Sequence, residues 1–379
     1  MLLGVVAHSS YIYITSASWL IHDTQASPLF DTIGIFQFIF RMPAFFIVSG
    51  FFCHMTLTRY GALPFLNIRL RRIGIPLITT AVVLNGIQNY ILERYHGGHR
   101  DALELFLTPP YWIHGGWVNH LWFLNCLLVF FLFAALIYAL LNRQIGRLAQ
   151  RLGSLRWLVN SGIYVLLFPA VLLVVDFIGY RIPHVITGAA PFLDFFELTH
   201  YAVFFAFGFL LGAYPEVLED FQNPRIWALA LVPVFVVLRL IFAPDNGHGV
   251  AHLMFSYSDA YFSWYLCIIC FYVFGKYFNS PSKLFAYLSD ASYSIYLFHH
   301  IFVVIIGMAL IPLALSIYVK FLAVMLTAGA LSLAIHHFGV LRSPVLRLLF
   351  NGKTPVEADK SIKAYGSFVR PPATGPGLG

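Results

Sequence analysis

Apolar stretches long enough to cross a lipid bilayer recur along this whole chain. Crossing about 30 Å of hydrocarbon as a helix takes about 20 largely apolar residues. An open sheet in lipid would leave backbone groups unpaired, so only helices fit such stretches here. The sequence therefore predicts an all-α fold, a polytopic membrane helix bundle of about ten transmembrane helices. The predicted spans are residues 1–21, 30–55, 73–92, 120–141, 158–179, 192–214, 226–243, 251–275, 288–311 and 317–341.

The composition excludes an ordinary soluble domain. Apolar residues make up 60% of the 379 positions and charged residues 10%, against about 25% charged in soluble domains. The net charge of +7 does not predict a nucleic-acid partner, because the Lys and Arg residues are dispersed among short loops. The cysteines lie within or at the ends of apolar segments, which favours packing over a disulfide framework; they are Cys53, Cys126, Cys267 and Cys270.

The basic residues predict the topology. Seventeen Lys and Arg residues fall on one side of the ten spans and four on the other. Cytoplasmic loops carry the excess of positive charge, so both termini are predicted to be cytoplasmic. We divide the chain into a transmembrane domain, 1–343, and a disordered cytoplasmic tail, 344–379, where the apolar pattern stops.

Arg41 lies near the centre of the second predicted span, between Phe40 and Met42. A basic side chain at mid-bilayer costs about 2.5–3.5 kcal/mol even on lenient scales, so it predicts a function or a buried partner. Pairing that holds the bundle together and binding of an anion are equally good interpretations. Both require an inward-facing side chain.

His8 lies in the first span amid apolar and small residues. Alone it favours a packing role. Together with Arg41 it favours group transfer, because neutral imidazole is the usual general base near pH 7 and a guanidinium stabilises a developing oxyanion.

A second polar cluster opens the ninth span, and another lies at the start of the fourth. Tyr296 shares one helical face with His299 and a neighbouring face with His300, and periodicity does not decide which histidine faces the bundle. A helix-packing seam is the alternative to catalysis. His120 is a candidate for contact with a hydroxyl acceptor, whereas Trp122 is typical of an interfacial anchor.

Several familiar chemistries have no support in the sequence. It contains no phosphate-binding Gly-x-x-x-x-Gly-Lys loop, no Gly-x-Ser-x-Gly elbow and no His-Glu-x-x-His pair. We therefore predict no metal site and no bound cofactor.

The ordered motifs resemble the membrane acyltransferase-3 superfamily and, within it, the glucans biosynthesis protein C group. The resemblance spans nearly the whole chain and rests on Leu3-Gly4 with His8 and Tyr11, Phe40-Arg41-Met42-Pro43, Phe45-Phe46, Ser49-Gly50, Arg59-Tyr60, Arg69, Arg72, Gly74-Ile75-Pro76, His120-Leu121-Trp122-Phe123-Leu124, Tyr296-Leu297, His299-His300, Phe350 and Gly352-Lys353.

The resemblance implies ten membrane helices, an acyl-CoA donor used from the cytoplasm and an O-acyl product on the far side. His8 matches the family's essential histidine and Arg41 the arginine of its Phe-Phe-x-x-Ser-Gly helix. The family also has an arginine eleven positions before that histidine, which here would precede Met1. We expect upstream in-frame codons to encode it.

These observations predict an acyltransferase of the bacterial inner membrane that moves succinyl from succinyl-CoA, a co-substrate, to hydroxyls of periplasmic glucan. His8, Arg41 and His299 are the predicted catalytic residues. The residues predicted to bind substrate are Ser49, Arg69, Arg72, His120, Trp122, Tyr296 and His300. Arg69 and Arg72 are suited to bind the phosphates of CoA. The alternative is that they only set the membrane topology as positive charges on the cytoplasmic side. The alternatives are O-acetylation of another exported polysaccharide and, in a different class, membrane transport.

The topology prediction can be checked by cysteine labelling in intact cells. A Leu148→Cys variant should resist a membrane-impermeant thiol reagent because position 148 is predicted to be cytoplasmic, whereas His99→Cys in an outer loop should react. Labelling at position 148 without cell lysis would contradict the ten-span topology.

Overall fold

The computed structural model describes residues 2–17, 19–113, 115–152, 161–181, 194–242, 249–278, 280 and 282–353. Every regular element within these ranges is helical, as predicted. The main helices are α1 (Leu2–Ser10), α2 (Pro28–Tyr60), α3 (Ala62–Arg69), α4 (Ile75–Thr79), α5 (Gly86–Tyr95), α6 (Ala102–Leu107), α7 (Pro109–Ile113), α8 (Trp122–Leu152), α10 (Tyr164–Arg181), α12 (Phe195–Ala213), α13 (Pro215–Phe221), α14 (Ile226–Ile241), α15 (Val250–Tyr277), α16 (Lys283–Leu310), α17 (Ile317–Ala334) and α18 (Pro344–Asn351). Short 3₁₀ or π segments join some of them: η1 (Tyr11–Tyr13), η2 (Leu70–Gly74), η3 (Thr80–Asn85), η4 (Asn119–Leu121) and η6 (Ile335–Val340).

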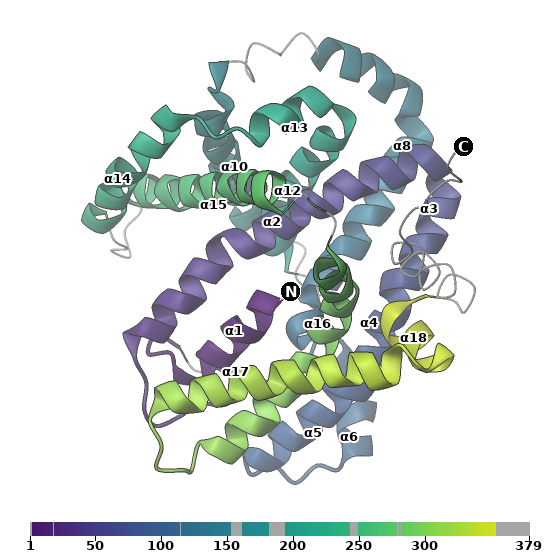
Figure 1. The fold of residues 1–379 in the computed structure, drawn as a ribbon, viewed down its shortest axis with the longest axis vertical. Coiled ribbons are helices and arrows are strands. Elements are labelled where there is room, and N and C mark those ends of the chain that lie inside the picture. The colour runs from purple at the N-terminus through teal and green to yellow at the C-terminus, as the bar shows by residue number, and fades with distance from the viewer. Residues whose placement is uncertain are drawn as a thin grey trace, which may run out of the picture.

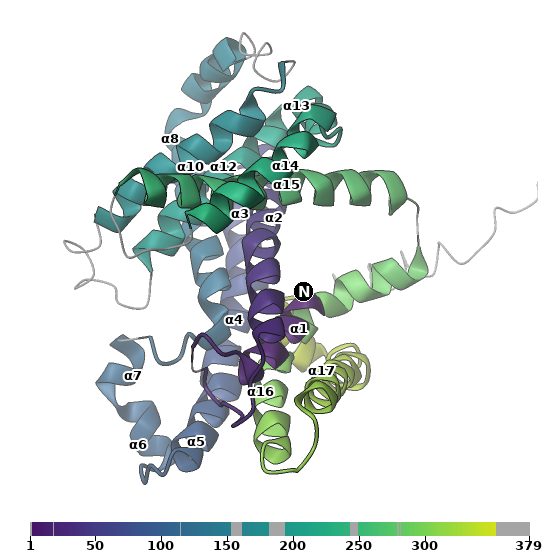
Figure 2. The ribbon, with the colours of Figure 1, turned by 90° about the vertical axis from the view of Figure 1, so that its left-hand side faces the viewer.

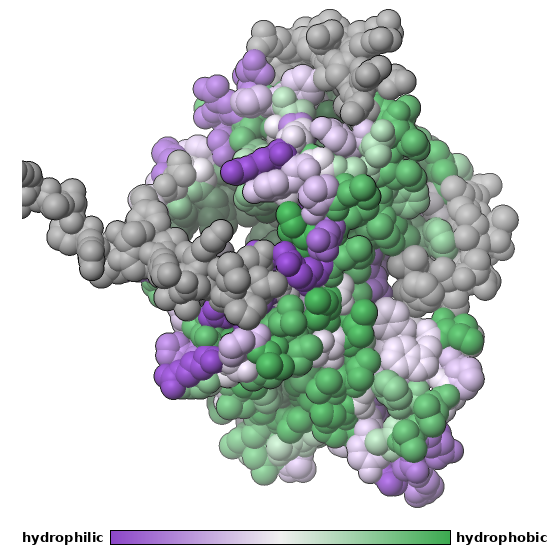
Figure 3. All heavy atoms as spheres, turned by 90° about the vertical axis from the view of Figure 1, so that its right-hand side faces the viewer, coloured by the Kyte–Doolittle hydropathy of each residue, from purple (hydrophilic) through white to green (hydrophobic). Residues whose placement is uncertain are grey.

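The helices form a polytopic membrane bundle. Among the described residues, seven helices are long and apolar enough to cross a bilayer, the bent pair α13 and α14 makes an eighth candidate, and two shorter apolar helices cover Leu2–Tyr13 and Tyr164–Gly179. Large apolar side chains on their outward faces remain exposed, including Phe133 at 60%, Leu240 at 68% and Leu326 at 64%. Figure 3 shows the broad hydrophobic surface that results on one face. Such a surface is stable in lipid and not in water.

Two boundaries differ from the sequence prediction. The first helical segment ends at Tyr13, and residues 14–17 and 19–27 lie in no helix and belong to the connection to α2. Residues 62–95 form one continuous helical run with two π segments, so Arg69 and Arg72 lie within a helix and not in a loop. The predicted first span was wrong beyond Tyr13 because Ser and Thr side chains offer the backbone local alternatives to a helix.

α2 connects the two halves of the bundle. Figures 1 and 2 show it running from α1, α16 and α17 on one side to α10, α12 and α15 on the other. Its start is fixed by the Ser27 hydroxyl, which accepts a hydrogen bond from the Leu29 N–H, and by Pro28 in the first turn. Its end is fixed by Gly61, whose φ of 78° an L side chain rarely adopts.

α2 and α12 pack backbone to backbone through glycines. A methyl group at Gly50 would overlap the carbonyl oxygen of Phe205, and one at Gly208 would overlap the carbonyl oxygen of Ile47. Small residues allow this approach in membranes, where dispersion contacts replace the missing hydrophobic drive between helices. The contact fixes the position of α2, and with it the position of Arg41.

Helical structure continues past residue 343. α18 follows a Ser343 cap that accepts from the Leu346 N–H, and it packs beside α4. Gly352 ends α18 with a φ of 59° and lies directly against the backbone of Arg71 and Arg72. Residues 344–353 of the predicted tail are therefore ordered, and residues 354–379 lie outside the described part of the chain.

The glycine contact predicts a stability difference. Gly208→Ala should destabilise the protein by about 1–3 kcal/mol, because the added methyl overlaps a backbone that cannot move aside easily. Gly329→Ala is the matched control, since a Cβ there meets no atom within 4 Å. Thermal unfolding in detergent checks both variants. Equal melting temperatures would contradict the contact.

Candidate active site

Four histidines form one cluster inside the bundle. The ring centroid of His8 lies 5.2 Å from that of His299 and 4.9 Å from that of His300. His120 stacks on His300 at 4.5 Å with an interplanar angle of 17°. His120, His299 and His300 are buried, and His8 is partly buried. The structure therefore brings both histidines of the ninth span into the cluster and leaves neither outside it.

Three chain segments position these rings. His8 comes from α1, which lies against α2, α16 and α17. His299 and His300 lie in the middle of α16. His120 lies in η4, directly after Asn119, whose φ of 43° turns the chain into the bundle. The Tyr296 hydroxyl then donates to the His120 carbonyl oxygen at 2.6 Å and ties η4 to α16.

Hydrogen bonds at one ring nitrogen of each α16 histidine fix what the other nitrogen can do. Nδ1 of His299 lies 2.9 Å from the Ile295 carbonyl oxygen and 2.8 Å from that of Tyr296, so it donates and leaves Nε2 with a lone pair. Nε2 is buried and has no partner among the described residues. Nδ1 of His300 lies 2.7 Å from Gln88 Oε1. When Nδ1 donates to that oxygen, Nε2 of His300 is also a base.

Arg41 has unused hydrogen-bonding capacity. Its Nη1 donates to the Leu3 carbonyl oxygen at 3.1 Å, while its Nε is buried without a partner. Within the described part of the chain no carboxylate forms an ion pair with it. Its titratable neighbours include the hydroxyls of Tyr11, Tyr201 and Tyr296. A guanidinium surrounded by phenols and lacking a counter-ion is suited to receive an anionic group of a ligand.

Arg41 and the imidazoles face the same gap. A methyl group on Gly4 would lie 3.5 Å from Arg41 Nη1 and 3.7 Å from His299 Nε2. His8 lies one turn further along α1 and contacts the same histidine. Nδ1 of His8 is buried and without a partner in the described structure. A cationic donor and one free imidazole nitrogen therefore meet beside Gly4, whose lack of a side chain keeps the gap open, and a second free nitrogen lies on the His8 ring, which contacts His299.

Trp19 covers the cluster from the connection between α1 and α2. Its ring centroid lies 5.8 Å from that of His8 and 5.4 Å from that of His300. The connection is held by a buried ion pair between Lys320 Nζ and Asp23 Oδ2 at 2.8 Å, and Lys320 also donates to the Ile311 carbonyl oxygen. The pair is 2% and 1% exposed, so it is shielded from water and salt.

The remaining predicted site residues lie outside this cluster. Trp122 packs on Tyr201 at 5.5 Å, on the Arg41 side of the bundle. Ser49 lies about two turns beyond Arg41 on α2, with no hydrogen bond to the cluster. Arg69 donates to the Phe52 carbonyl oxygen and the Thr56 hydroxyl, further along α2. The structure therefore does not bring Ser49 and Arg69 together with the histidines.

Arg72 lies beside Gly352, the residue that ends α18. A Cβ added at Gly352 would approach the Arg72 Cα, so this arginine lies under the end of α18. In the described residues no group of three or more His, Cys, Asp or Glu side chains is arranged to hold a metal ion.

Sequence reasoning missed several residues that shape the site. Gln88 and Trp19 carry no signal in one sequence, because amide and aromatic side chains are common near membrane surfaces. The charges on Arg239, Asp259 and Lys320, in contrast, are a signal that the sequence contains. Each lies within a predicted span, and the rule that singled out Arg41 applies to them equally.

The fold and the site define a polytopic membrane protein with a buried imidazole–guanidinium centre. A family model described as an acyltransferase domain, Acyl_transf_3, matches residues 1–336, so the chain belongs to the acyltransferase-3 family and is an acyltransferase. It is similar to glucans biosynthesis protein C of Salmonella paratyphi B, Salmonella enteritidis PT4 and Salmonella typhi. Each is 26% identical over 366 residues, which cover 95% of this chain and 94% of the relative. No solved structure matches the chain.

We expect substitutions of Asp23 and Lys320 to have non-additive effects on stability. Lys320→Met alone should destabilise the protein by about 3–5 kcal/mol, because it leaves Asp23 buried and unpaired. The double variant Asp23→Asn/Lys320→Met should recover part of that loss. Melting temperatures of the single and double variants check this, with Lys283→Met at the exposed start of α16 as the control. A double variant less stable than Lys320→Met would contradict the pairing.

Proposed function

We propose that the protein transfers a succinyl group from succinyl-CoA to hydroxyl groups of a periplasmic glucan. The observation that carries the proposal is Arg41, a guanidinium with no carboxylate partner among the residues that the structure describes, facing the same gap as His299 Nε2. A free base and a free anion donor in one low-dielectric site are what acyl transfer to an alcohol needs. A merely structural arginine would be expected to have its own counter-ion.

The chemistry follows from these groups. His8 takes the proton of the acceptor hydroxyl as that oxygen attacks the thioester carbonyl carbon. The new C–O bond forms, Arg41 stabilises the oxyanion, and the C–S bond then breaks. The leaving thiolate receives the proton and departs as CoA–SH, so the products are an ester and free CoA. His299 and His300 have free nitrogens close enough to share the proton. His120 stacks on His300 and limits the movement of the His300 ring.

The choice of glucan rests on the names of the relatives, and the choice of succinyl rests on the family resemblance and on the chemistry of Arg41. The curated relatives are named for glucan biosynthesis and match this chain almost end to end. The dicarboxylic acyl group also suits Arg41, which can grip a carboxylate or a thioester oxygen. An acetyl group transferred to another exported polysaccharide is the nearest alternative, and labelled donors distinguish the two.

The placement of the reaction rests on the topology prediction. The protein lies in the inner membrane, with the donor entering from the cytoplasmic side and the acceptor on the far side. Arg69 and Arg72 lie toward the predicted cytoplasmic end of the helical run 62–95, where they would meet the CoA phosphates. The histidine cluster lies between the two sides, in the bundle interior.

Three substitutions test the proposal. His8→Ala should abolish acyl transfer in membranes supplied with labelled succinyl-CoA and glucan, because no base is left at that position. Arg41→Lys should reduce transfer at least a hundredfold although the charge is kept, because an ammonium lacks the planar fork of donors. His299→Ala should be impaired less than His8→Ala.

The controls separate chemistry from folding. His252→Ala, at the exposed start of α15, should keep full activity. Membrane insertion and melting temperature are measured for every variant. Full succinylation of glucan by a stably folded His8→Ala protein would refute the catalytic assignment and return His8 to a packing role.

A further inference from the structure

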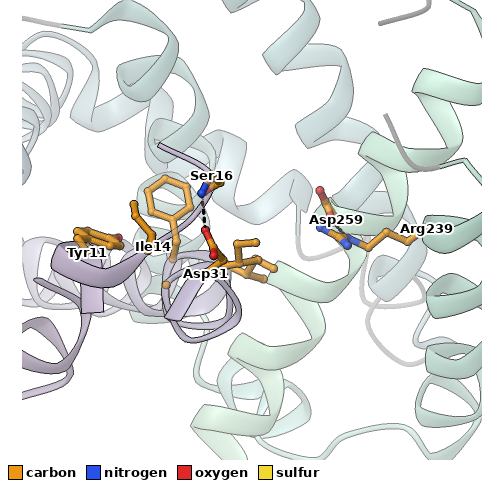
Figure 4. Close-up of a pocket in the computed structure, with 10 residues that line it drawn as sticks. Tyr11, Ile14, Ser16, Asp31, Arg239 and Asp259 are labelled. Atoms are coloured by element: carbon orange, nitrogen blue, oxygen red, sulfur yellow. Dashed lines mark hydrogen bonds and ion pairs between the residues drawn. The ribbon is translucent and has the colours of Figure 1, made fainter. Parts of the chain in front are cut away.

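A cavity of about 360 Å³ lies beside the histidine cluster, on its α14–α15 side. Its volume falls in the range of small-molecule sites. Figure 4 shows Tyr11, Ile14 and Asp31 on one side and the Arg239–Asp259 pair on the other. The cavity therefore lies between the start of α2 and the α14–α15 pair, beside the contact in which Ser263 of α15 donates to the Ile39 carbonyl oxygen of α2.

Its polar groups retain free hydrogen-bonding capacity. Arg239 uses Nε to bind Asp259 Oδ1, and no hydrogen bond occupies its two Nη groups or Asp259 Oδ2 within the described structure. The Tyr11 hydroxyl likewise has no hydrogen bond there. Asp31, in contrast, is fully used: it accepts from the N–H groups of Thr15 and Ser16 and from the Thr15 hydroxyl. Asp31 therefore shapes the rim of the cavity. Arg239, Asp259 and Tyr11 face the cavity as donors and acceptors of hydrogen bonds.

The position of the Arg239–Asp259 pair is costly. Arg239 lies in the last turn of the apolar helix α14 and Asp259 lies within the apolar helix α15, and their side chains are 32% and 34% exposed. An ion pair within the lipid-facing part of the bundle that keeps unused donors and acceptors at the wall of a cavity is suited to a polar ligand.

The charges of the lining select the class of ligand. One guanidinium and two carboxylates give a net formal charge of −1, which disfavours CoA phosphates and dicarboxylic acyl groups. Side-by-side donors and acceptors from Arg239 and Asp259, facing the Tyr11 ring, suit a neutral ligand with adjacent hydroxyls and an apolar face. A hexose ring has both properties.

The cavity is also in the right place for the second substrate. Its α2 residues lie in the first turns of that helix, the end opposite the arginine-rich segment. Tyr11 is the wall that it shares with the catalytic cluster, because the Tyr11 ring lies 5.6 Å from that of His8 and packs on Gly34. A hydroxyl group of a ligand in this cavity would reach His8 by extending past the Tyr11 ring.

We infer that this cavity is the acceptor subsite: it binds a neutral hexose unit through Arg239, Asp259 and Tyr11 and directs one hydroxyl toward His8. The inference rests on the proposed acyl transfer and adds the residues that hold the acceptor. Arg239 and Asp259 are binding residues, and their loss should affect the acceptor and leave the donor unaffected.

Kinetics with separate donor and acceptor titrations test the inference. Arg239→Gln and Asp259→Asn should each raise KM for a glucose oligosaccharide acceptor about tenfold, the loss of one or two hydrogen bonds to a charged or polar group. KM for the acyl-CoA donor should stay within twofold. Asp220→Asn is the matched control, because it breaks the Asp220–Arg225 pair between α13 and α14, away from the cavity.

A charge swap separates binding from packing. Arg239→Asp/Asp259→Arg keeps an ion pair, so it should restore stability lost in the single variants and leave the acceptor KM raised. Recovery of the acceptor KM by the swap would mean that the pair only supports the fold, and would overturn the inference. An unchanged acceptor KM in the single variants, or equal effects on donor and acceptor, would do the same.

Direct binding distinguishes failure of this inference from failure of the proposed function. Purified protein in lipid nanodiscs is titrated with the oligosaccharide in the absence of any acyl donor. The unmodified protein should bind the oligosaccharide, and Asp259→Asn should bind it about tenfold more weakly. This result supports the subsite even if neither succinyl-CoA nor acetyl-CoA acts as a donor. No binding in the unmodified protein, or displacement by lipid alone, overturns it.

Discussion

The cost of placing charge in a low-dielectric interior governs this molecule. Arg41 cannot face lipid, so α2 must present it to the centre of the bundle. The backbone contact of α2 with α12 through Gly50 and Gly208 fixes that orientation. The helices on the other side then complete the enclosure and bring His8, from α1, to the same gap. The site therefore follows from the enclosure of Arg41, which has no carboxylate partner in the described part of the chain.

The polar groups around that gap fall into two kinds. Some are fully paired and hold the structure, as Asp23 and Lys320 do at the connection that carries Trp19. Others keep free atoms inside the bundle, as Arg41 and His299 do. Because an unpaired buried group costs free energy, the second kind marks the positions where, in the proposed function, substrate would supply the missing partner. The same distinction separates Asp31 from Asp259 at the neighbouring cavity.

Much of the fold was predictable from the sequence, since lipid imposes helices of nearly fixed length. The helical class and most spans were predicted correctly, whereas the first helix is shorter than predicted and Arg69 lies within a helix. The exact number of ten spans stays a prediction. For the site, the choice of His8 and Arg41 rested on the cost of polarity in lipid and on family motifs. Their catalytic roles stay predictions, but the structure places them beside one gap.

The sequence by itself determined that this chain is a helical membrane protein with costly polar groups inside it, because hydropathy and charge are local properties of each segment. Only the tertiary structure decided which of those groups meet. His299 and His300 differ by 100° on one helix, and periodicity could not choose between them. Both contact His8 because α1 lies against α16 and η4 supplies His120 from the other side. Contacts between segments more than a hundred residues apart depend on packing, which no local pattern records.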